Sequence, residues 1–205
     1  MRAPPFSAKL RAMRFALLLV PLLAACPGNL PTYNYAGEPD PRNKEIVLGV
    51  GDVVGINVWE QKDLTVETAV RADGMITMPL AGDLRAAGTT PSSLRGTITE
   101  RIAKYVKDPI VTVAVRGWKS YRFTIEGEVG RPGVYSSDQF VRVSDALAMA
   151  GGLSRFARRG GIKLFRTDPQ ADKAKAIPLD YDALASGKRP DMNIWVLPGD
   201  SIFVP

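Results

Sequence analysis

Short segments separated by closely spaced turn residues are the feature that most constrains the fold of this chain. From Ile46 onward, glycine, proline and aspartate interrupt the sequence repeatedly, and the segments between them are rich in β-branched residues. Such segments are typical of strands. Residues 90–105 instead carry apolar side chains at helical spacing, with Thr90 as a cap and Pro91 at the first helical position. The pattern predicts an α+β fold.

The predicted elements form two groups, which indicate two small domains over residues 45–117 and 118–205. In the first group, strands are predicted at 53–59, 64–70, 75–78 and 110–115. Asp73-Gly74 is predicted to be the hairpin turn between the second and third of these strands. In the second group, strands are predicted at 121–125, 162–166, 176–179 and 201–204, and short helices at 144–149 and 181–185.

The N-terminus has the pattern of an export leader. Four basic residues and no acidic residue precede an apolar stretch over 15–23, which is too short to span a bilayer as a stable helix. Leu23-Ala24-Ala25-Cys26 follows and resembles the bacterial lipobox. We therefore expect residues 1–25 to be a lipoprotein signal peptide and Cys26 to be lipidated, which attaches the protein to a membrane. The alternative is a signal peptide whose cleavage region contains a free cysteine.

Residues 26–44 are predicted to be a tether. Residues 27–43 contain four prolines and two glycines, a composition typical of extended linkers. We expect this tether to lift the first domain off the membrane, with Tyr33 and Tyr35 as candidates to dock on that domain.

Composition excludes several classes of function. The chain has a net charge of +6, but loss of the four basic leader residues leaves 23 basic and 21 acidic residues. This near balance removes the main support for a nucleic-acid partner. Cys26 is the only cysteine and histidine is absent, which excludes an internal disulfide, thiolate or imidazole zinc sites and a Ser-His-Asp triad. No cofactor is expected.

Several motifs, taken in order, resemble those of the outer-membrane polysaccharide export lipoproteins. The first domain resembles their polysaccharide export domain, through Gly51-Asp52, Val58-Trp59, Val70-Arg71-Ala72-Asp73-Gly74, Met78-Pro79-Leu80-Ala81-Gly82, Ala86-Ala87-Gly88-Thr89 and Lys107-Asp108-Pro109-Ile110-Val111. The second resembles their soluble-ligand-binding β-grasp domain, through Glu126-Gly127-Glu128-Val129-Gly130-Arg131-Pro132-Gly133, Ala148-Met149-Ala150-Gly151-Gly152 and Pro198-Gly199-Asp200.

The resemblance implies export of capsular, exopolysaccharide or O-antigen-like glycans without a chemical step. It implies a homo-oligomeric ring, anchored to the outer membrane with its body in the periplasm, and an inner-membrane polysaccharide co-polymerase, often coupled to a tyrosine kinase. The best-known members continue into an amphipathic pore helix, whereas this sequence ends at Pro205. We therefore expect a separate outer-membrane barrel as partner. The alternatives are a monomeric periplasmic carbohydrate-binding lipoprotein and a glycan-processing enzyme.

Aromatic and basic residues are the candidates for glycan contact. The aromatic residues on predicted strands are Trp59, Trp118, Trp195, Tyr121 and Tyr135, and we expect them to fill cores rather than stack on sugars. The strongest basic cluster is Arg155, Arg158, Arg159 and Lys163, with Arg166 beyond it. These residues are candidates to face an acidic glycan in a ring. A solvated face or a salt-bridge network between subunits is the alternative.

Three aspartates beside glycines resemble catalytic carboxylates only superficially. Asp52, Asp73 and Asp200 each lie in a predicted turn, and no sequence pattern brings two of them to the separation that glycoside cleavage requires. Gly51-Asp52-Val53-Val54 also resembles Gly199-Asp200-Ser201-Ile202. We interpret the two segments as unrelated turn-to-strand junctions.

Overall fold

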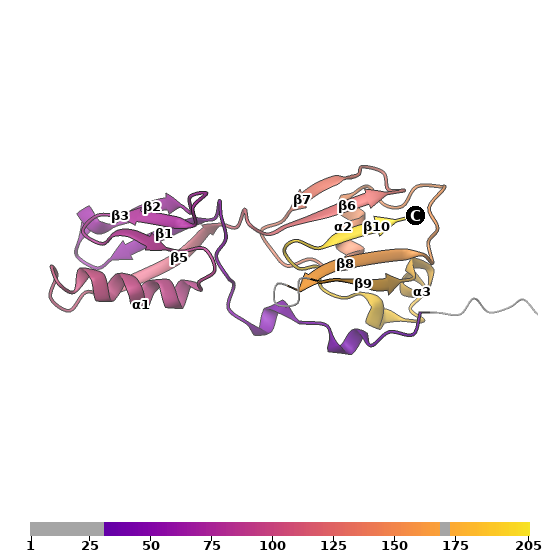
Figure 1. The fold of residues 1–205 in the computed structure, drawn as a ribbon, viewed down its shortest axis with the longest axis horizontal. Helices are drawn as coiled ribbons and strands as arrows, with labels where there is room; N and C mark the ends of the chain where they lie inside the picture. Colours follow the sequence, from indigo (N-terminus) through magenta and orange to yellow (C-terminus); the bar gives the residue numbers. More distant parts are fainter. Residues whose placement is uncertain (1–30, 169–172) are drawn as a thin grey trace, which may run out of the picture.

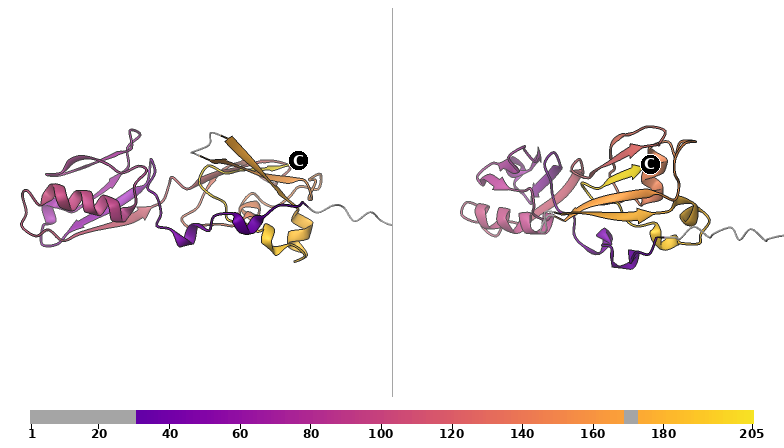
Figure 2. Two further views of the ribbon diagram at one scale, coloured as in Figure 1. Left: turned by 60° about the horizontal axis from the view of Figure 1, so that its bottom comes forward. Right: turned by 45° about the vertical axis from the view of Figure 1, so that its right-hand side comes forward.

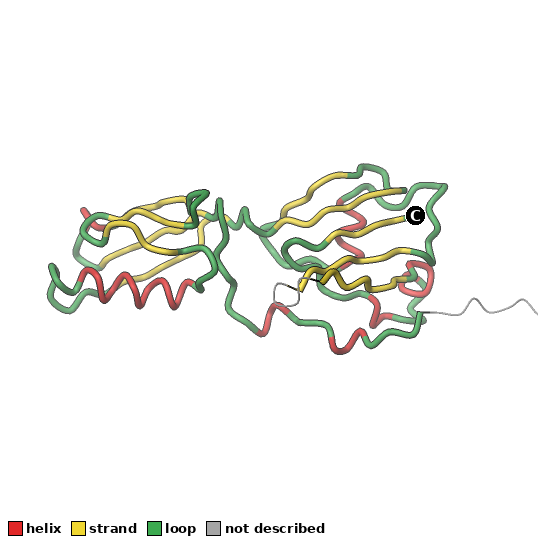
Figure 3. Tube along the Cα trace, viewed as in Figure 1, coloured by secondary structure: helices red, strands yellow, loops and turns green. Residues whose placement is uncertain are grey.

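The structure, a computed structural model, describes residues 31–168 and 173–205 and has two domains side by side along its long axis (Figure 1). Each domain has its own hydrophobic cluster. One cluster takes its residues from 48–111, and the other combines Tyr35 with residues from 121–204. The chain crosses between the domains twice, over residues 44–48 and again over 117–121 (Figure 3). The mixture of short strands and few helices confirms the predicted α+β class.

The first domain packs one long helix against two small antiparallel sheets. The three-stranded sheet has the order β2-β1-β5, formed by β1 (Val53–Val58), β2 (Val66–Ala69) and β5 (Val111–Gly117). β3 (Met75–Met78) pairs with β4 (Gly82–Arg85), and η3 (Lys62–Leu64) joins β1 to β2. Helix α1 (Pro91–Ile102) begins where predicted, because the Thr90 side chain accepts a hydrogen bond from Ser93 N. Its buried stripe is Leu94, Ile98 and Ile102.

Two predictions for the first domain are wrong. Asp73-Gly74 does not join a hairpin, because β3 pairs forward with β4 and β2 pairs only with β1. Gly74 N bonds back to Arg71 O in a turn that directs the chain into the next hairpin. The helix also ends at Ile102, so Tyr105 leaves the predicted buried face and is exposed.

The second domain is a five-stranded mixed sheet with helices on one face. Its elements are β6 (Arg122–Gly127), β7 (Gly133–Ser136), α2 (Val143–Met149), β8 (Ile162–Asp168), β9 (Lys173–Leu179), α3 (Tyr181–Ala185), η4 (Pro190–Met192) and β10 (Ser201–Val204). The strand order is β7-β6-β10-β8-β9, and the central pair β6 and β10 is parallel. Joining the first and last strands of the domain in parallel at its centre gives the arrangement expected of a β-grasp.

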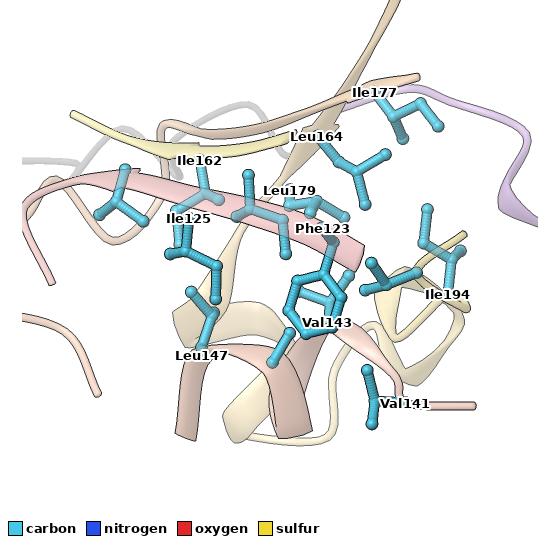
Figure 4. Packing of buried hydrophobic residues seen from close by; sticks show 14 of the residues in the cluster. Phe123, Ile125, Val141, Val143, Leu147, Ile162, Leu164, Ile177, Leu179 and Ile194 are labelled. Carbon is cyan, nitrogen blue, oxygen red and sulfur yellow. The ribbon is translucent and has the colours of Figure 1, made fainter. Parts of the chain in front are cut away.

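Apolar residues from one face of this sheet pack against α2 (Figure 4). Phe123 and Ile125 of β6 and Leu164 of β8 alternate with outward-facing residues, as a half-buried strand requires. From the helix, Val143 and Leu147 point into the same core. The cap of α2 is Arg142 and not the predicted Ser144, which lies inside the helix, because the Asp145 side chain accepts a hydrogen bond from Arg142 N at the start of the helix.

The part of the predicted tether from residue 31 to 44 lies along the second domain (Figure 2). We call these residues the N-terminal strap. It contains η1 (Tyr35–Gly37) and η2 (Pro41–Asn43). Tyr35 is buried in the core of the second domain, and its hydroxyl donates to Pro178 O. The expectation that Tyr33 and Tyr35 dock on the first domain is therefore wrong.

The two Gly-Asp segments have the same local structure. Gly51 and Gly199 both have positive φ, of 89° and 85°. In the first turn, Gly49 N donates to Asp52 Oδ2 at 2.8 Å. In the second, Leu197 N donates to Asp200 Oδ2 at 2.7 Å. Each aspartate is buried and starts a strand, but their further partners differ, since Asp52 accepts from Ser120 N and Oγ whereas Asp200 binds Arg166.

Among the described glycines of the second domain, Gly127 leaves the least room for a side chain. A Cβ at this position would lie 1.9 Å from Val204 O, and the φ of 89° disfavours any side chain. We expect Gly127→Ala to lower the free energy of unfolding by about 3 kcal/mol, because backbone must move apart in the central strand pair. Urea unfolding of the two proteins measures this difference.

Gly133→Ala is the matched control, because a Cβ at Gly133 meets no atom within 4 Å. We expect this variant to unfold within about 0.5 kcal/mol of the wild type. Equal stability of the two variants would show that the close contact between Gly127 and Val204 O does not restrict residue 127 to glycine.

Candidate functional site

Four charged side chains hold the N-terminal strap on the second domain: Glu38, Arg166, Lys175 and Asp200. We call them the charged clasp. Arg166 Nε lies 3.0 Å from Asp200 Oδ1, and Nη2 lies 2.6 Å from Oδ2, a bidentate pair. Its Nη1 donates to Glu38 Oε2 of the strap at 2.7 Å. The clasp therefore connects the strap, β8 and the turn before β10 through one guanidinium.

Glu38 is the strap's contribution to the clasp. Its side chain is only 4% exposed, and it also accepts hydrogen bonds from Lys175 and the Tyr33 hydroxyl. Burial alone would raise the pKa of Glu38, but the hydrogen bonds from Lys175 and Tyr33 outweigh it and hold the pKa below its usual range. At Asp200, burial raises the pKa, and hydrogen bonds from Arg166 oppose that increase. Neutral pH therefore favours an ionised Glu38 and a docked strap.

Aromatic contacts extend the attachment of the strap beyond the clasp. The guanidinium groups of Arg42 and Arg142 both lie over the Trp195 ring, at 4.8 and 4.4 Å from its centroid. Arg142 also donates to Asn193 O, which fixes this stack on the second domain. The Arg189 guanidinium lies 5.4 Å from the centroid of the Tyr35 ring, on which it stacks. The strap thus contributes both charge and aromatic surface to its attachment.

A pocket of about 590 Å³ adjoins the clasp. Its lining includes Glu38, Lys44, Arg166, Lys175 and Pro198. Both carboxylates of the clasp already have partners, since Glu38 accepts from Arg166, Lys175 and the Tyr33 hydroxyl and Asp200 accepts from Arg166 and Leu197 N. Neither is therefore placed as a free acid or base. Within residues 31–168 and 173–205, no group of three metal-ligating side chains gathers to hold an ion.

The structure separates Arg166 from the other residues of the predicted basic cluster. Arg155, Arg158 and Lys163 are exposed at one end of the second domain, and Arg159 pairs with Asp182 there. Arg166 is buried in the clasp and does not belong to that surface. Glycan contact by Arg155, Arg158, Arg159 and Lys163 stays a prediction. The three aspartates each bond a different partner, Asp52 bonding Ser120, Asp73 bonding Arg71 and Asp200 bonding Arg166.

Of the aromatic residues expected in cores, two are exceptions: Trp59, and Trp195, which is half-buried outside the core against the guanidinium groups of Arg42 and Arg142. Trp118 stacks on the buried Tyr121 with ring centroids 4.7 Å apart, and Tyr135 stacks on Phe123 at 6.1 Å. Trp59 is 65% exposed at the end of β1, so the prediction of burial is wrong for this residue. Strand propensity alone does not distinguish a core tryptophan from one just past the last paired residue.

Trp59 is one of several exposed apolar side chains in the loops of the first domain, and the sequence did not indicate their exposure. The others are Leu80, Tyr105 and Ile110, and we call the four residues the distal tip. Trp59 N donates to Ile110 O, and Arg101 at the end of α1 donates to Ala81 O in the β3–β4 turn. These loops therefore meet at the end of the first domain remote from the second (Figure 1).

Backbone strain is concentrated in the same loops. The non-glycine residues with positive φ in the described part of the chain are Glu60, Leu80 and Asp108, at 60°, 60° and 48°. Such conformations cost free energy and persist where surrounding structure enforces them, often at functional sites. The strain thus supports the distal tip as a second candidate interaction surface.

No helix in the described ranges is long and apolar enough to cross a membrane. The lipidation predicted at Cys26 lies outside the described residues.

Two family descriptions match the chain in the order of its domains. The polysaccharide biosynthesis/export protein family matches residues 40–116, and the SLBB domain matches residues 122–175. The chain thus contains a polysaccharide export domain followed by an SLBB domain. The resemblance found in the sequence motifs is confirmed.

Curated relatives carry corresponding descriptions. The EPS I polysaccharide export outer membrane protein EpsA of Ralstonia solanacearum is 34% identical over 131 residues, which cover 52% of this chain and 35% of the relative. The capsule polysaccharide export protein BexD of Haemophilus influenzae is 25% identical over 126 residues, which cover 51% of this chain and 32% of the relative. The matched region therefore spans about a third of the length of these relatives.

We expect Glu38→Gln to release the strap without unfolding the second domain. The variant loses charge-assisted hydrogen bonds to Arg166 and Lys175, which lowers the free energy of strap opening by about 2 kcal/mol. Amide exchange at Glu38 and Lys44, whose N–H groups bond Tyr35 O and Pro41 O, should then become about thirtyfold faster. Hydrogen exchange with mass spectrometry measures this rate.

Glu45→Gln is the control, because it removes the same charge just beyond the strap, where Glu45 bonds Ser92. Exchange in the strap should then match the wild type. Because the pKa of Glu38 is lowered, docking in the wild type is complete above its ordinary value of 4.5 and weakens as the pH falls through the lowered pKa. Unchanged exchange in Glu38→Gln would contradict the clasp.

Proposed function

We propose that this protein is a lipid-anchored component of an outer-membrane translocon that exports capsular polysaccharide or exopolysaccharide. The observation that carries the proposal is the succession of an export domain over residues 40–116 and an SLBB domain over residues 122–175. We place the structural domains at 45–117 and 118–205. The protein serves as part of a conduit, with no chemical step of its own.

The strap determines how an anchor at Cys26 would orient the body. Residues 26–31 span at most about 18 Å even when fully extended. Pro31 lies at the end of the second domain remote from the first, where Arg189 donates to its carbonyl oxygen (Figure 1). The second domain is therefore proposed to lie next to the membrane, and the first domain to extend into the periplasm. This arrangement replaces the expected tether that lifts the first domain.

We propose three kinds of partner for this anchored body. Copies of the chain form a ring that surrounds the polysaccharide, and a separate outer-membrane partner completes the exit. An inner-membrane polysaccharide co-polymerase, coupled to a tyrosine kinase, delivers the glycan. The distal tip is the proposed contact for this last partner, because it faces away from the anchor and exposes apolar side chains on strained loops.

Loss of the protein should move polysaccharide from the cell surface to the periplasm. In a deletion strain, we expect the wild-type gene to restore surface polysaccharide and Cys26→Ala to restore less than a tenth of it, since an unanchored body cannot remain at the exit. Quantification of surface and periplasmic glycan measures this outcome. Immunoblotting of the variant controls for its abundance.

Normal surface polysaccharide in the deletion strain would contradict the export role. It would favour the monomeric carbohydrate-binding lipoprotein, which the mass of the purified protein and its affinity for the glycan would then test. Full restoration by Cys26→Ala would leave export intact and contradict the anchor.

Site-specific photo-crosslinking tests the distal tip. A photoreactive amino acid in place of Tyr105, which is 64% exposed, should give crosslinks to an inner-membrane protein in intact cells. The control is the same substitution at Val134, which is 67% exposed on β7 of the second domain, where no such crosslink is expected. Crosslinks from Tyr105 to copies of this chain alone would contradict the assignment.

A further inference from the structure

An exposed basic loop with a protruding aromatic ring joins α2 to β8 at one end of the second domain. Arg155 and Arg158 are exposed, and Phe156 between them is 69% exposed. The Arg155 guanidinium lies 4.8 Å from the centroid of the Phe156 ring. Lys163, the second residue of β8, is exposed just beyond the loop. We call Arg155, Phe156, Arg158 and Lys163 the basic patch.

The basic patch lies at the same end of the domain as Pro31. Its loop is tied to α3, because Tyr181 N donates to Arg159 O at 2.8 Å and Arg159 pairs with Asp182. The loop after α3 is tied to the strap in turn, since Arg189 N donates to Ala183 O and Arg189 Nη1 donates to Pro31 O. Figures 1 and 2 show the start of the strap and this loop at the end remote from the first domain.

The cations of the basic patch lack acidic partners within the part of the chain that the structure describes. Arg159 has Asp182 and Arg189 has Asp191, but no ion pair involves Arg155, Arg158 or Lys163. Like charges held near one another repel, so they favour an anionic surface outside the molecule. An arginine fork fits phosphate oxygens in particular.

We propose that the basic patch binds the anionic phospholipid headgroups of the membrane that holds the anchor. Arg155, Arg158 and Lys163 contact lipid phosphates, and the Phe156 ring enters the boundary between headgroups and acyl chains. The inference rests on the proposed anchoring at Cys26, because that anchor brings the end at Pro31, and the patch with it, to the membrane. Basic and aromatic side chains together are the composition of interfacial membrane contacts.

The lipid contact gives the anchored body a fixed orientation. An acyl anchor alone leaves the second domain free to tilt about the residues between Cys26 and the strap. Contact through the basic patch holds the end of the second domain against the bilayer, so that the first domain extends away from it. The acyl anchor holds the protein whatever the salt concentration and lipid charge. The basic patch adds a second attachment, whose strength depends on both.

Vesicle binding by protein that lacks the acyl chains tests the basic patch by itself. The protein begins at residue 26 as Cys26→Ser and contains every described residue. We expect it to sediment with vesicles of phosphatidylethanolamine and phosphatidylglycerol at low salt, and not with phosphatidylcholine vesicles. The triple variant Arg155→Gln, Arg158→Gln, Lys163→Gln should bind about a hundredfold more weakly, at about fivefold for each basic residue.

The matched control is Lys62→Gln, Lys104→Gln, Lys107→Gln, which removes the same charge from exposed residues at the far end of the first domain. This variant should bind vesicles as the parent protein does. Phe156→Ser should weaken binding about tenfold, and the loss should remain at high salt, because it removes an apolar contact. Circular dichroism of each variant confirms that it is folded.

Three results would overturn the proposal. They are no preference of the parent protein for anionic vesicles, equal loss of binding in the two triple variants, and binding of acidic polysaccharide but not of vesicles through the basic patch. The last result would assign the patch to the glycan. Palmitate labelling of the full chain tests the anchor separately, so a failure of the patch and a failure of the proposed anchoring are distinguishable.

Discussion

The buried pair of Arg166 and Asp200 is the interaction on which the second domain and its strap depend. Asp200 accepts from Leu197 N in the turn that starts β10, the strand at the centre of the sheet. Arg166 extends the same interaction to Glu38 of the strap. Burying these charges is costly, and only the bidentate geometry and the added hydrogen bonds offset the loss of hydration. The Arg166 guanidinium therefore connects the turn before β10 to the N-terminal strap.

Because of this connection, the proline-rich segment before the first domain is a docked strap and not a free tether. Composition predicts an extended tether that stands free of the domains, whereas the structure shows residues 31–44 fixed on the second domain by the clasp, by Tyr35 and by the Trp195 stack. Because the strap is fixed, the position of its first residue determines the position of both domains, whereas a free tether would leave the domains free to move. The two proposals about the membrane, the orientation and the lipid contact, both follow from this fixed path.

Local patterns in the sequence predicted local structure well. Thr90-Pro91 starts α1, the stripe of Leu94, Ile98 and Ile102 is buried, and the ordered motifs indicate the family. Long-range pairing was not predictable: nothing near Glu38 indicates that it meets Arg166, 128 residues away. The exposure of Trp59 and the pairing of β3 with β4 depend on contacts between segments, which one sequence does not reveal. The positive φ of Leu80 likewise has no signal, because glycine usually takes that conformation.

The two crossings of the chain between the domains have a mechanical consequence. A single linker would act as a swivel and let one domain rotate freely about it. Two linkers side by side, over residues 44–48 and 117–121, resist such rotation and leave bending across the pair as the soft motion. The hydrogen bonds from Ser120 to Asp52 further join the second linker to the turn that follows the first. Torque applied at the distal end of the first domain is therefore transmitted to the strap, and through the strap to the proposed membrane anchor.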